Sequence, residues 1–180
     1  LCFIFSCTLL FSQNPKVNQD RLENRIMELA KFGLQENGET ERVAFSDADV
    51  AAQKWVVQTL ENLGLDVHID FAGNVIGRRE GKKQSLKPIS FGSHIDRVPN
   101  GGNYDGCVGS MASLEVLEIL NENNIQTKHP LEIIIFSNEE GGVMGSRALA
   151  GHLGKNALGV RNSTGYSMGE GIMRLGGDTT

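Results

Sequence analysis

Three short polar segments, each beside an apolar run, carry residue types that bind metal ions or move protons. In the first, His94 and Asp96 lie two residues apart, so a strand would place both side chains on one face. A metal-bound imidazole usually donates its second N–H to a carboxylate, and the spacing of Asp96 suits that role. A His-x-Asp pair alone indicates a metal site only weakly.

The second segment is the glycine-rich run 100–106 (NGGNYDG), which contains Asp105. Its glycines allow the backbone to bend tightly around a site. Taken alone, Asp105 is most simply a capping residue of the helix that follows.

The third segment, Asn138-Glu139-Glu140-Gly141-Gly142, follows the apolar run 131–136 (LEIIIF). Two adjacent carboxylates at the end of a buried strand are costly because like charges repel and lose hydration. A cation would remove that conflict. Adjacent residues point different ways, so one Glu could bind metal while the other faces a substrate. A solvated loop is the competing interpretation of this segment alone.

Together, the three segments predict a hydrolytic metal site. His, Asp and Glu supply nitrogen and oxygen ligands suited to zinc, manganese or cobalt. Two metals that share a carboxylate can activate a water and polarise a carbonyl, and a free Glu can take up the proton.

The elements that must position these residues form an α/β pattern. We predict a mixed, largely parallel sheet with helices on both faces, and a site at the carboxyl ends of the strands. The helix over 107–121 has a broad apolar face, which includes Val116 and Ile119, as buried helices do. Five helices are predicted, over 19–32, 47–64, 107–121, 145–151 and 166–175, and the second begins at a Ser46–Asp49 capping box and stops at Gly64. Four strands are predicted, over 67–71, 74–78, 88–94 and 131–136.

Composition excludes several classes of protein. The chain has 180 residues, 39% of them hydrophobic, and 17 Lys+Arg against 22 Asp+Glu, for a net charge of −5. That is enough for one domain with a real core. A nucleic-acid partner is not expected because there is no basic stripe, and the basic loop 78–87 is interpreted as a solvated turn. No apolar run reaches the roughly 18 residues that a stable membrane span needs.

The first 13 residues have the composition of a targeting segment. Residues 1–11 (LCFIFSCTLLF) are uncharged and mostly apolar, which predicts the remnant of a secretory signal peptide over 1–13. A buried strand or the tail of a membrane span is the competing interpretation. Export to the periplasm or medium is expected, with a cytoplasmic location as the alternative. Removal of Cys2 and Cys7 would leave Cys107 without a disulfide partner.

Two long motifs, GSHIDRVPNGGNYDGCVGSMASLEVLEIL and FSNEEGGVMGSRALAG, resemble the allantoate amidohydrolase and N-carbamoyl-L-amino-acid amidohydrolase family. That family belongs to the wider group of di-metal aminoacylase and glutamate carboxypeptidase-like hydrolases. The resemblance implies two divalent ions, zinc or manganese with cobalt possible. It also implies roles at matched positions: His94 as a ligand of one metal, Asp105 as the bridging carboxylate, Glu140 as a ligand of the second metal, Glu139 as the general base, and Asp96 as the partner that orients His94.

The resemblance further predicts a cis peptide between Asp105 and Gly106. Other family features are absent from these 180 residues: two more His ligands and an inserted dimerisation domain that supplies substrate-binding residues. The chain is therefore expected to be the N-terminal part of a catalytic domain over 14–180, inactive by itself. The full-length protein is expected to be a homodimer. The remaining histidines do not match the family ligands and are expected at the surface: His68, His129 and His152.

The expected substrate is a small ureido or amide compound. By the resemblance, the full-length protein would hydrolyse the ureido C–N bond of an N-carbamoyl amino acid, allantoate or a similar acid. The loop between the Glu-Glu-Gly and Gly-Ser-Arg motifs is short, at 142–144, which leaves the substrate open. An exported aminoacylase or dipeptidase is the alternative. A non-catalytic binding module would require loss of Glu139 or of a ligand, and all these positions are present.

Overall fold

The computed structural model describes residues 14–154 and 156–180, so the predicted signal segment 1–13 lies outside the described residues. Every predicted helix and strand occurs, with its ends moved by a few residues, and one short 3-10 helix was not predicted. No described helix is long and apolar enough to cross a membrane. In chain order the elements are α1 Gln19–Ala30, α2 Asp47–Asn62, β1 Asp66–Ile69, β2 Val75–Arg79, β3 Ile89–His94, α3 Cys107–Glu122, β4 Leu131–Phe136, α4 Met144–Leu149, the 3-10 helix Ala157–Gly159, and α5 Met168–Arg174.

The four strands form one mixed sheet in the order β1-β2-β4-β3. The mixed α/β class is confirmed, but within the described residues only β3 and β4 are parallel. A tight turn joins β1 to β2, closed by the Asp70 carboxylate, which accepts from the Ala72 and Asn74 N–H groups. Such a short turn forces antiparallel pairing, whereas the crossover through α3 permits the parallel pair β3–β4.

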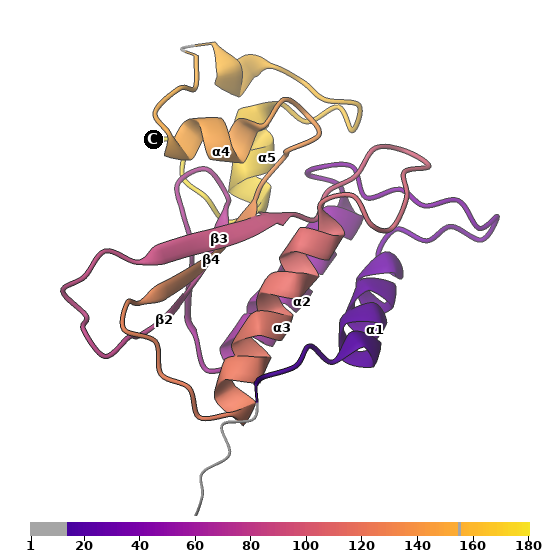
Figure 1. Ribbon diagram of the computed structural model, residues 1–180. Helices are drawn as coiled ribbons and strands as arrows, with labels where there is room; N and C mark the ends of the chain where they lie inside the picture. The colour runs from indigo at the N-terminus through magenta and orange to yellow at the C-terminus, as the bar shows by residue number, and fades with distance from the viewer. Residues whose placement is uncertain (1–13, 155) are drawn as a thin grey trace, which may run out of the picture.

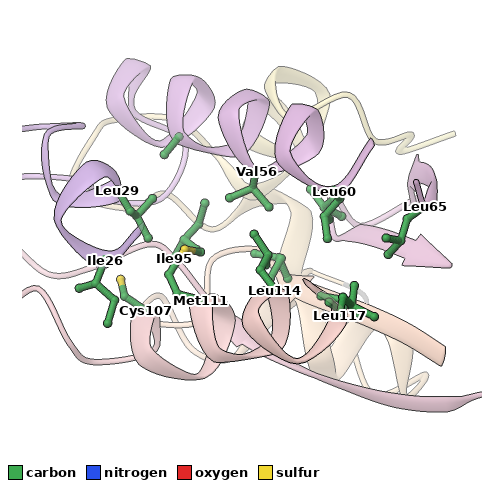
Figure 2. Close-up of a cluster of buried hydrophobic side chains, with 14 of the residues drawn as sticks. Ile26, Leu29, Val56, Leu60, Leu65, Ile95, Cys107, Met111, Leu114 and Leu117 are labelled. Carbon is green, nitrogen blue, oxygen red and sulfur yellow. The ribbon is translucent and has the colours of Figure 1, made fainter. Parts of the chain in front are cut away.

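The three long helices share one face of the sheet. Figure 1 shows α2 and α3 side by side next to the strands, with α1 alongside them. In Figure 2, Val56 and Leu60 of α2 point toward Met111, Leu114 and Leu117 of α3. These side chains are fully buried and form one cluster with sheet residues that include Val75, Ile133 and Ile135. Burial of this apolar surface is the main source of stability for the fold.

The prediction of helices on both faces is not met by the described residues. The opposite face of the sheet carries a polar row, in which Arg78, Glu132 and Ser90 are neighbours across the strands. Arg78 lies 2.9 Å from a Glu132 carboxylate oxygen, and the Ser90 hydroxyl donates to Glu132 over 3.2 Å. The same face also carries an apolar pair, because Ile76 and Ile134 are neighbours across β2 and β4 and both are buried.

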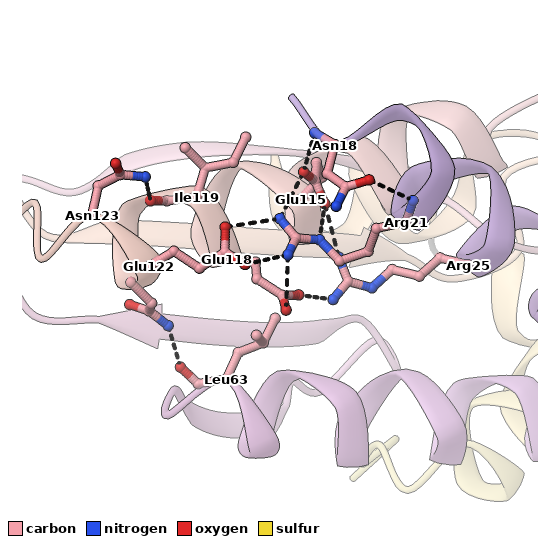
Figure 3. A network of polar contacts seen from close by, with 10 residues as sticks. Asn18, Arg21, Arg25, Leu63, Glu115, Glu118, Ile119, Glu122 and Asn123 are labelled. Carbon is pink, nitrogen blue, oxygen red and sulfur yellow. Dashed lines mark hydrogen bonds and ion pairs between the residues drawn. The ribbon is translucent and has the colours of Figure 1, made fainter. Parts of the chain in front are cut away.

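Helix α3 buries the carboxylate of Glu115, whereas the sequence analysis had expected the neighbouring Val116 to be buried. Val116 is 43% exposed, so its assignment to the buried face was wrong, whereas Glu115 is 1% exposed. Glu115 accepts hydrogen bonds from Arg21 Nε, at 2.6 Å, and from the Asn18 N–H, at 2.9 Å (Figure 3). Burial raises the pKa of Glu115, but these bonds and the charge of Arg25 more than offset it and lower the pKa overall. The network ties α1 to α3.

The predicted capping box at the start of α2 is half formed. The Ser46 hydroxyl accepts from the Asp49 N–H, as expected. The Asp49 carboxylate does not return to Ser46 and instead accepts from the Phe45 N–H over 2.8 Å. Phe45 has a φ of 73°, a left-handed conformation, and its ring is fully buried. Asp49 therefore stabilises an unusual backbone turn that delivers Phe45 to the core.

Asp49 should make stability depend on pH. Burial, together with the charge of Asp96, raises its pKa from 3.8 to about 7. Between these values the unfolded chain loses the proton while the folded chain keeps it, so the free energy of unfolding falls as pH rises. We expect Asp49→Asn, which still accepts from Phe45, to gain stability over wild type from about pH 4 to pH 7, by up to about 4 kcal/mol.

Urea unfolding of both proteins at several pH values measures this gain. Asp47→Asn, at an exposed carboxylate in the same helical turn, is the matched control. A stability difference between Asp49→Asn and wild type that stays constant from pH 4 to pH 8 would contradict the assignment.

Candidate active site

The carboxyl ends of the parallel strands β3 and β4 meet, and they bring two of the polar segments together. His94, the last residue of β3, is buried, and its Nδ1 lies 3.0 Å from the Asp96 carbonyl oxygen and 3.4 Å from a carboxylate oxygen of Asp96. The Asp96 carboxylate, 1% exposed, accepts from the Glu139 N–H at 3.2 Å and from the Glu140 N–H at 3.1 Å. Asp96 thus fixes the imidazole and the Glu-Glu loop to each other.

The charge of His94 is controlled by this environment. Burial disfavours the imidazolium and lowers the pKa, but the hydrogen bonds and charge of Asp96, with a further contribution from Glu139, raise it to about 9. Asp96 therefore orients His94 and increases the electron density on its ring. Nε2 of His94 lies 3.6 Å from a Glu139 carboxylate oxygen, on the opposite side of the ring.

The carboxylates of the cluster repel one another. Partial burial raises the pKa of Glu140; the charge of His94 lowers it, and the charges of Asp105, Asp96 and Glu139 raise it further, so the net shift is upward. Asp105 and Glu140 are exposed, whereas Glu139 is half-buried. This is the conflict of like charges that the sequence predicted at the end of β4.

The donor set of this cluster fits a divalent cation. It combines an imidazole nitrogen with carboxylate oxygens, and a cation would relieve the repulsion that raises the pKa of Glu140. Across residues 14–154 and 156–180, no three His, Cys, Asp or Glu side chains converge on one point as metal ligands do. His94, Asp105 and Glu140 thus lie in one region, and their roles as metal ligands stay a prediction.

Gly106 closes the loop that carries Asp105 against the imidazole. Every described peptide bond is trans, so the predicted cis peptide between Asp105 and Gly106 was wrong. Gly106 reaches the start of α3 with a φ of 64°, which glycine adopts without strain, so a trans chain can make the turn. A Cβ on Gly106 would lie 2.3 Å from His94 Nε2, so only glycine fits here.

Residues that the sequence did not single out hold the cluster in place. Arg42 is fully buried and donates to the carbonyls of Ile95, Leu29 and Phe32, which anchors the segment after β3 to the end of α1. No local pattern around Arg42 indicates this role, because its partners come from distant segments.

The buried Asn74 anchors the segment that follows β4. Its Oδ1 accepts from the Ser137 N–H at 2.9 Å, and its Nδ2 donates to Asp70 and to the Gly145 carbonyl. The Glu139–Glu140 loop is therefore held at both ends.

The remaining histidines lie outside the cluster. His68 and His152 are exposed, as predicted. His129 lies near the surface, and its Nδ1 is 2.9 Å from the Lys87 carbonyl oxygen. Cys107 is a free, buried thiol among the described residues.

The mixed α/β fold is that of the carbamoylase- and peptidase-like hydrolases. Residues 74–166 match the model of the family described as Peptidase family M28. This match spans more than half of the chain, and the chain belongs to that family.

The names of similar proteins agree with the resemblance to the N-carbamoyl-L-amino-acid amidohydrolase family. The chain is 39% identical over 167 residues to the N-carbamoyl-L-amino acid amidohydrolase of Geobacillus stearothermophilus, covering 90% of the chain and 41% of that protein. It is 38% identical over 140 residues to the ureidoglycolate hydrolase of Oryza sativa subsp. japonica, covering 75% and 29%. The crystal structure of a hydantoinase/carbamoylase family amidase from Burkholderia ambifaria superimposes with a TM-score of 0.86 at 32% identity, covering 93% and 43%. The chain thus spans less than half the length of these relatives.

Proposed function

We propose that the full-length protein is a metal-dependent hydrolase that cleaves the ureido C–N bond of N-carbamoyl amino acids, allantoate or similar ureido acids. One observation carries the proposal: Asp96 joins the buried His94 to the Glu139–Glu140 loop where β3 and β4 end. The relatives that share this fold are named for carbamoyl and ureido substrates. Ammonia and carbon dioxide would leave the carbamoyl group.

In this proposal His94, Asp105 and Glu140 would hold two divalent ions, zinc or manganese with cobalt possible. Bound ions would supply Lewis-acid polarisation of the carbonyl and a lowered pKa for the attacking water. Glu139, half-buried beside His94, would accept the proton of that water and deliver it to the leaving nitrogen. Asp96 would keep the imidazole in its orientation and the tautomer that leaves Nε2 available. Export through residues 1–13 and a homodimeric assembly are further parts of the proposal.

An aminoacylase or dipeptidase activity is the second candidate. It is favoured by the match of residues 74–166 to a family described as a peptidase family. The same residues would serve an amide or peptide substrate, because both reactions add water to a carbonyl carbon and expel a nitrogen.

Ammonia release by the full-length gene product from N-carbamoyl amino acids and allantoate tests the proposal. We expect turnover that a chelator abolishes and that manganese or zinc restores. Hydrolysis of dipeptides or N-acyl amino acids, without ammonia from any ureido acid, would establish the second candidate. Turnover that survives complete removal of divalent ions would refute the metal dependence.

A further inference from the structure

The loop between Asp96 and Asp105 contains an Asn-Gly pair, Asn100-Gly101. Asn100 is exposed and has a φ of 56°, a left-handed conformation that Asn tolerates in turns. The pair therefore lies between the carboxylate that orients His94 and the carboxylate that is expected to bind metal. A chemical change at Asn100 would alter the segment that links these two parts of the cluster.

An asparagine followed by glycine can lose its own side-chain amide, because glycine has no Cβ to shield its backbone nitrogen. That nitrogen gives its proton to solvent and attacks the side-chain carbonyl carbon of the asparagine. A new C–N bond forms, the bond to the amide nitrogen breaks, and ammonia leaves, so that the product is a cyclic succinimide. Water then adds to either carbonyl of the ring and opens it, which leaves aspartate or isoaspartate. The reaction needs no reagent other than solvent water.

A second Asn-Gly pair, Asn37-Gly38, allows a comparison within the same chain. Both asparagines are exposed. Both glycine N–H groups donate to the carbonyl three residues earlier over 3.0 Å, from Gly101 to Val98 and from Gly38 to Gln35. The backbone nitrogens that would attack are therefore restrained alike in the two pairs.

The two asparagine side chains are held differently. At Asn37, Nδ2 donates to a Glu39 carboxylate oxygen over 2.9 Å, and Oδ1 accepts from the Glu39 N–H over 3.0 Å. Both bonds must break before this side chain can turn toward the next nitrogen. The Asn100 side chain makes no hydrogen bond within the part of the chain that the structure describes, although its loop contains others, such as the bond from Arg97 to Asn103.

We propose that Asn100 is a site of spontaneous deamidation and isomerisation, and that the native fold directs this reaction to Asn100 rather than to Asn37. The Asn100 side chain can reach the Gly101 nitrogen by rotation about its own bonds once the hydrogen bond of that nitrogen opens, as bonds in exposed turns do. The two side-chain bonds at Asn37 should slow its reaction by about 10-fold relative to Asn100.

Isoaspartate at position 100 would disturb the anchor of this loop. The Asn100 N–H donates to the Thr40 carbonyl over 2.9 Å, and the Thr40 hydroxyl donates to the Gly101 carbonyl over 3.0 Å. Isoaspartate carries the main chain through its Cβ, which adds one atom between the two groups that Thr40 holds. It also adds a negative charge between Asp96 and Asp105, where carboxylates already repel one another. We therefore expect the modified protein to bind metal more weakly and to lose activity, an effect that rests on the proposed function.

The test incubates the full-length protein in a mildly alkaline buffer and follows deamidation by trypsin digestion and mass spectrometry. Trypsin yields the peptides 98–128 and 32–42, so each Asn-Gly pair falls in its own peptide, and fragmentation locates the modified residue. A sample digested before incubation corrects for reaction during digestion. We expect the deamidated fraction to grow about 10-fold faster at Asn100 than at Asn37. In unfolding concentrations of urea the two rates should converge, because the hydrogen bonds that distinguish the sites are lost.

Asn100→Gly removes the reacting side chain and retains the left-handed backbone without strain. We expect the wild-type protein to lose ammonia-releasing activity in proportion to its deamidated fraction at Asn100, and the Asn100→Gly protein to keep its starting activity over the same incubation. Asn37→Gly is the matched control, because it removes the other Asn-Gly pair and should give no protection.

The covalent readout is independent of the catalytic activity. Equal rates at the two sites of the folded protein, a faster reaction at Asn37, or no reaction at Asn100 would each overturn the proposal. If the full-length protein cleaves no ureido compound but reacts preferentially at Asn100, the proposed function fails and this modification site stands. Deamidation at Asn100 with metal binding and activity unchanged would overturn the expected effect on the cluster.

Discussion

Replacing Glu139 with Gln should lower kcat for ureido hydrolysis by about 10²- to 10⁴-fold, the usual contribution of a general base. Gln has nearly the same shape but cannot accept a proton from water. Glu139 is half-buried, with a carboxylate oxygen 3.6 Å from His94 Nε2, and a Gln side chain of the same length can occupy the same space. The N–H of residue 139 would still donate to Asp96, because that bond comes from the backbone.

Ammonia release and metal content measured on the same preparations separate the possible causes. A large loss of kcat with metal retained is the expected result. Glu61→Gln, at an exposed position on α2, is the control for a change of charge alone. If the Glu139→Gln protein kept more than about a tenth of wild-type kcat, Glu139 could not be the general base.

The second large effect is expected from Gly106→Ala, a change of one methyl group. The added Cβ would lie 2.3 Å from His94 Nε2 and within 2.5 Å of two further ring atoms, so the imidazole must move. The positive φ of Gly106 adds about 1–2 kcal/mol of backbone strain. Because a displacement of about 1 Å in an active site can cost about 10²-fold in rate, we expect at least that loss of kcat/KM, together with weaker metal binding.

Two other glycines isolate the contributions of strain and contact. Gly64 has a φ of 83° and open space around it, so Gly64→Ala introduces strain without a collision. Gly102 lies in the same loop as Gly106; a Cβ there would meet no atom within 4 Å and its φ is not positive, so Gly102→Ala introduces neither. Equal activity losses in Gly106→Ala and Gly64→Ala, measured as kcat/KM beside thermal unfolding, would show that contact with His94 is not the cause.

Local sequence patterns determined the elements and the places where chemistry could occur. The apolar run of β4, the helical spacing of α3 and the glycine-rich turn before it depend on residues close together in the chain, so periodicity and turn preferences suffice to predict them. The same reasoning placed His94 and Glu139 at strand ends, and a parallel pair of strands brings such ends together.

Contacts between distant segments were decided by the tertiary structure. Arg42 reaches the Ile95 carbonyl across 53 residues, and Asn74 reaches Ser137 across 63. No local period encodes such pairs, because they depend on strand order and on which face of the sheet the helices cover. Sequence alone likewise predicted a largely parallel sheet, whereas the short β1–β2 turn imposed antiparallel pairing.

The buried polar side chains show most clearly which features the local sequence determined and which only the tertiary structure decided. The type and spacing of residues predicted that His94 and Asp96 would act together, since two residues of a strand share a face. The sequence did not indicate that the Asp96 carboxylate would also accept from the loop after β4, that Glu115 would be buried, or that the Asn138 amide would be left unpaired. Hydrogen bonding and burial of a side chain depend on every neighbour that packs around it, and only the folded chain brings those neighbours together.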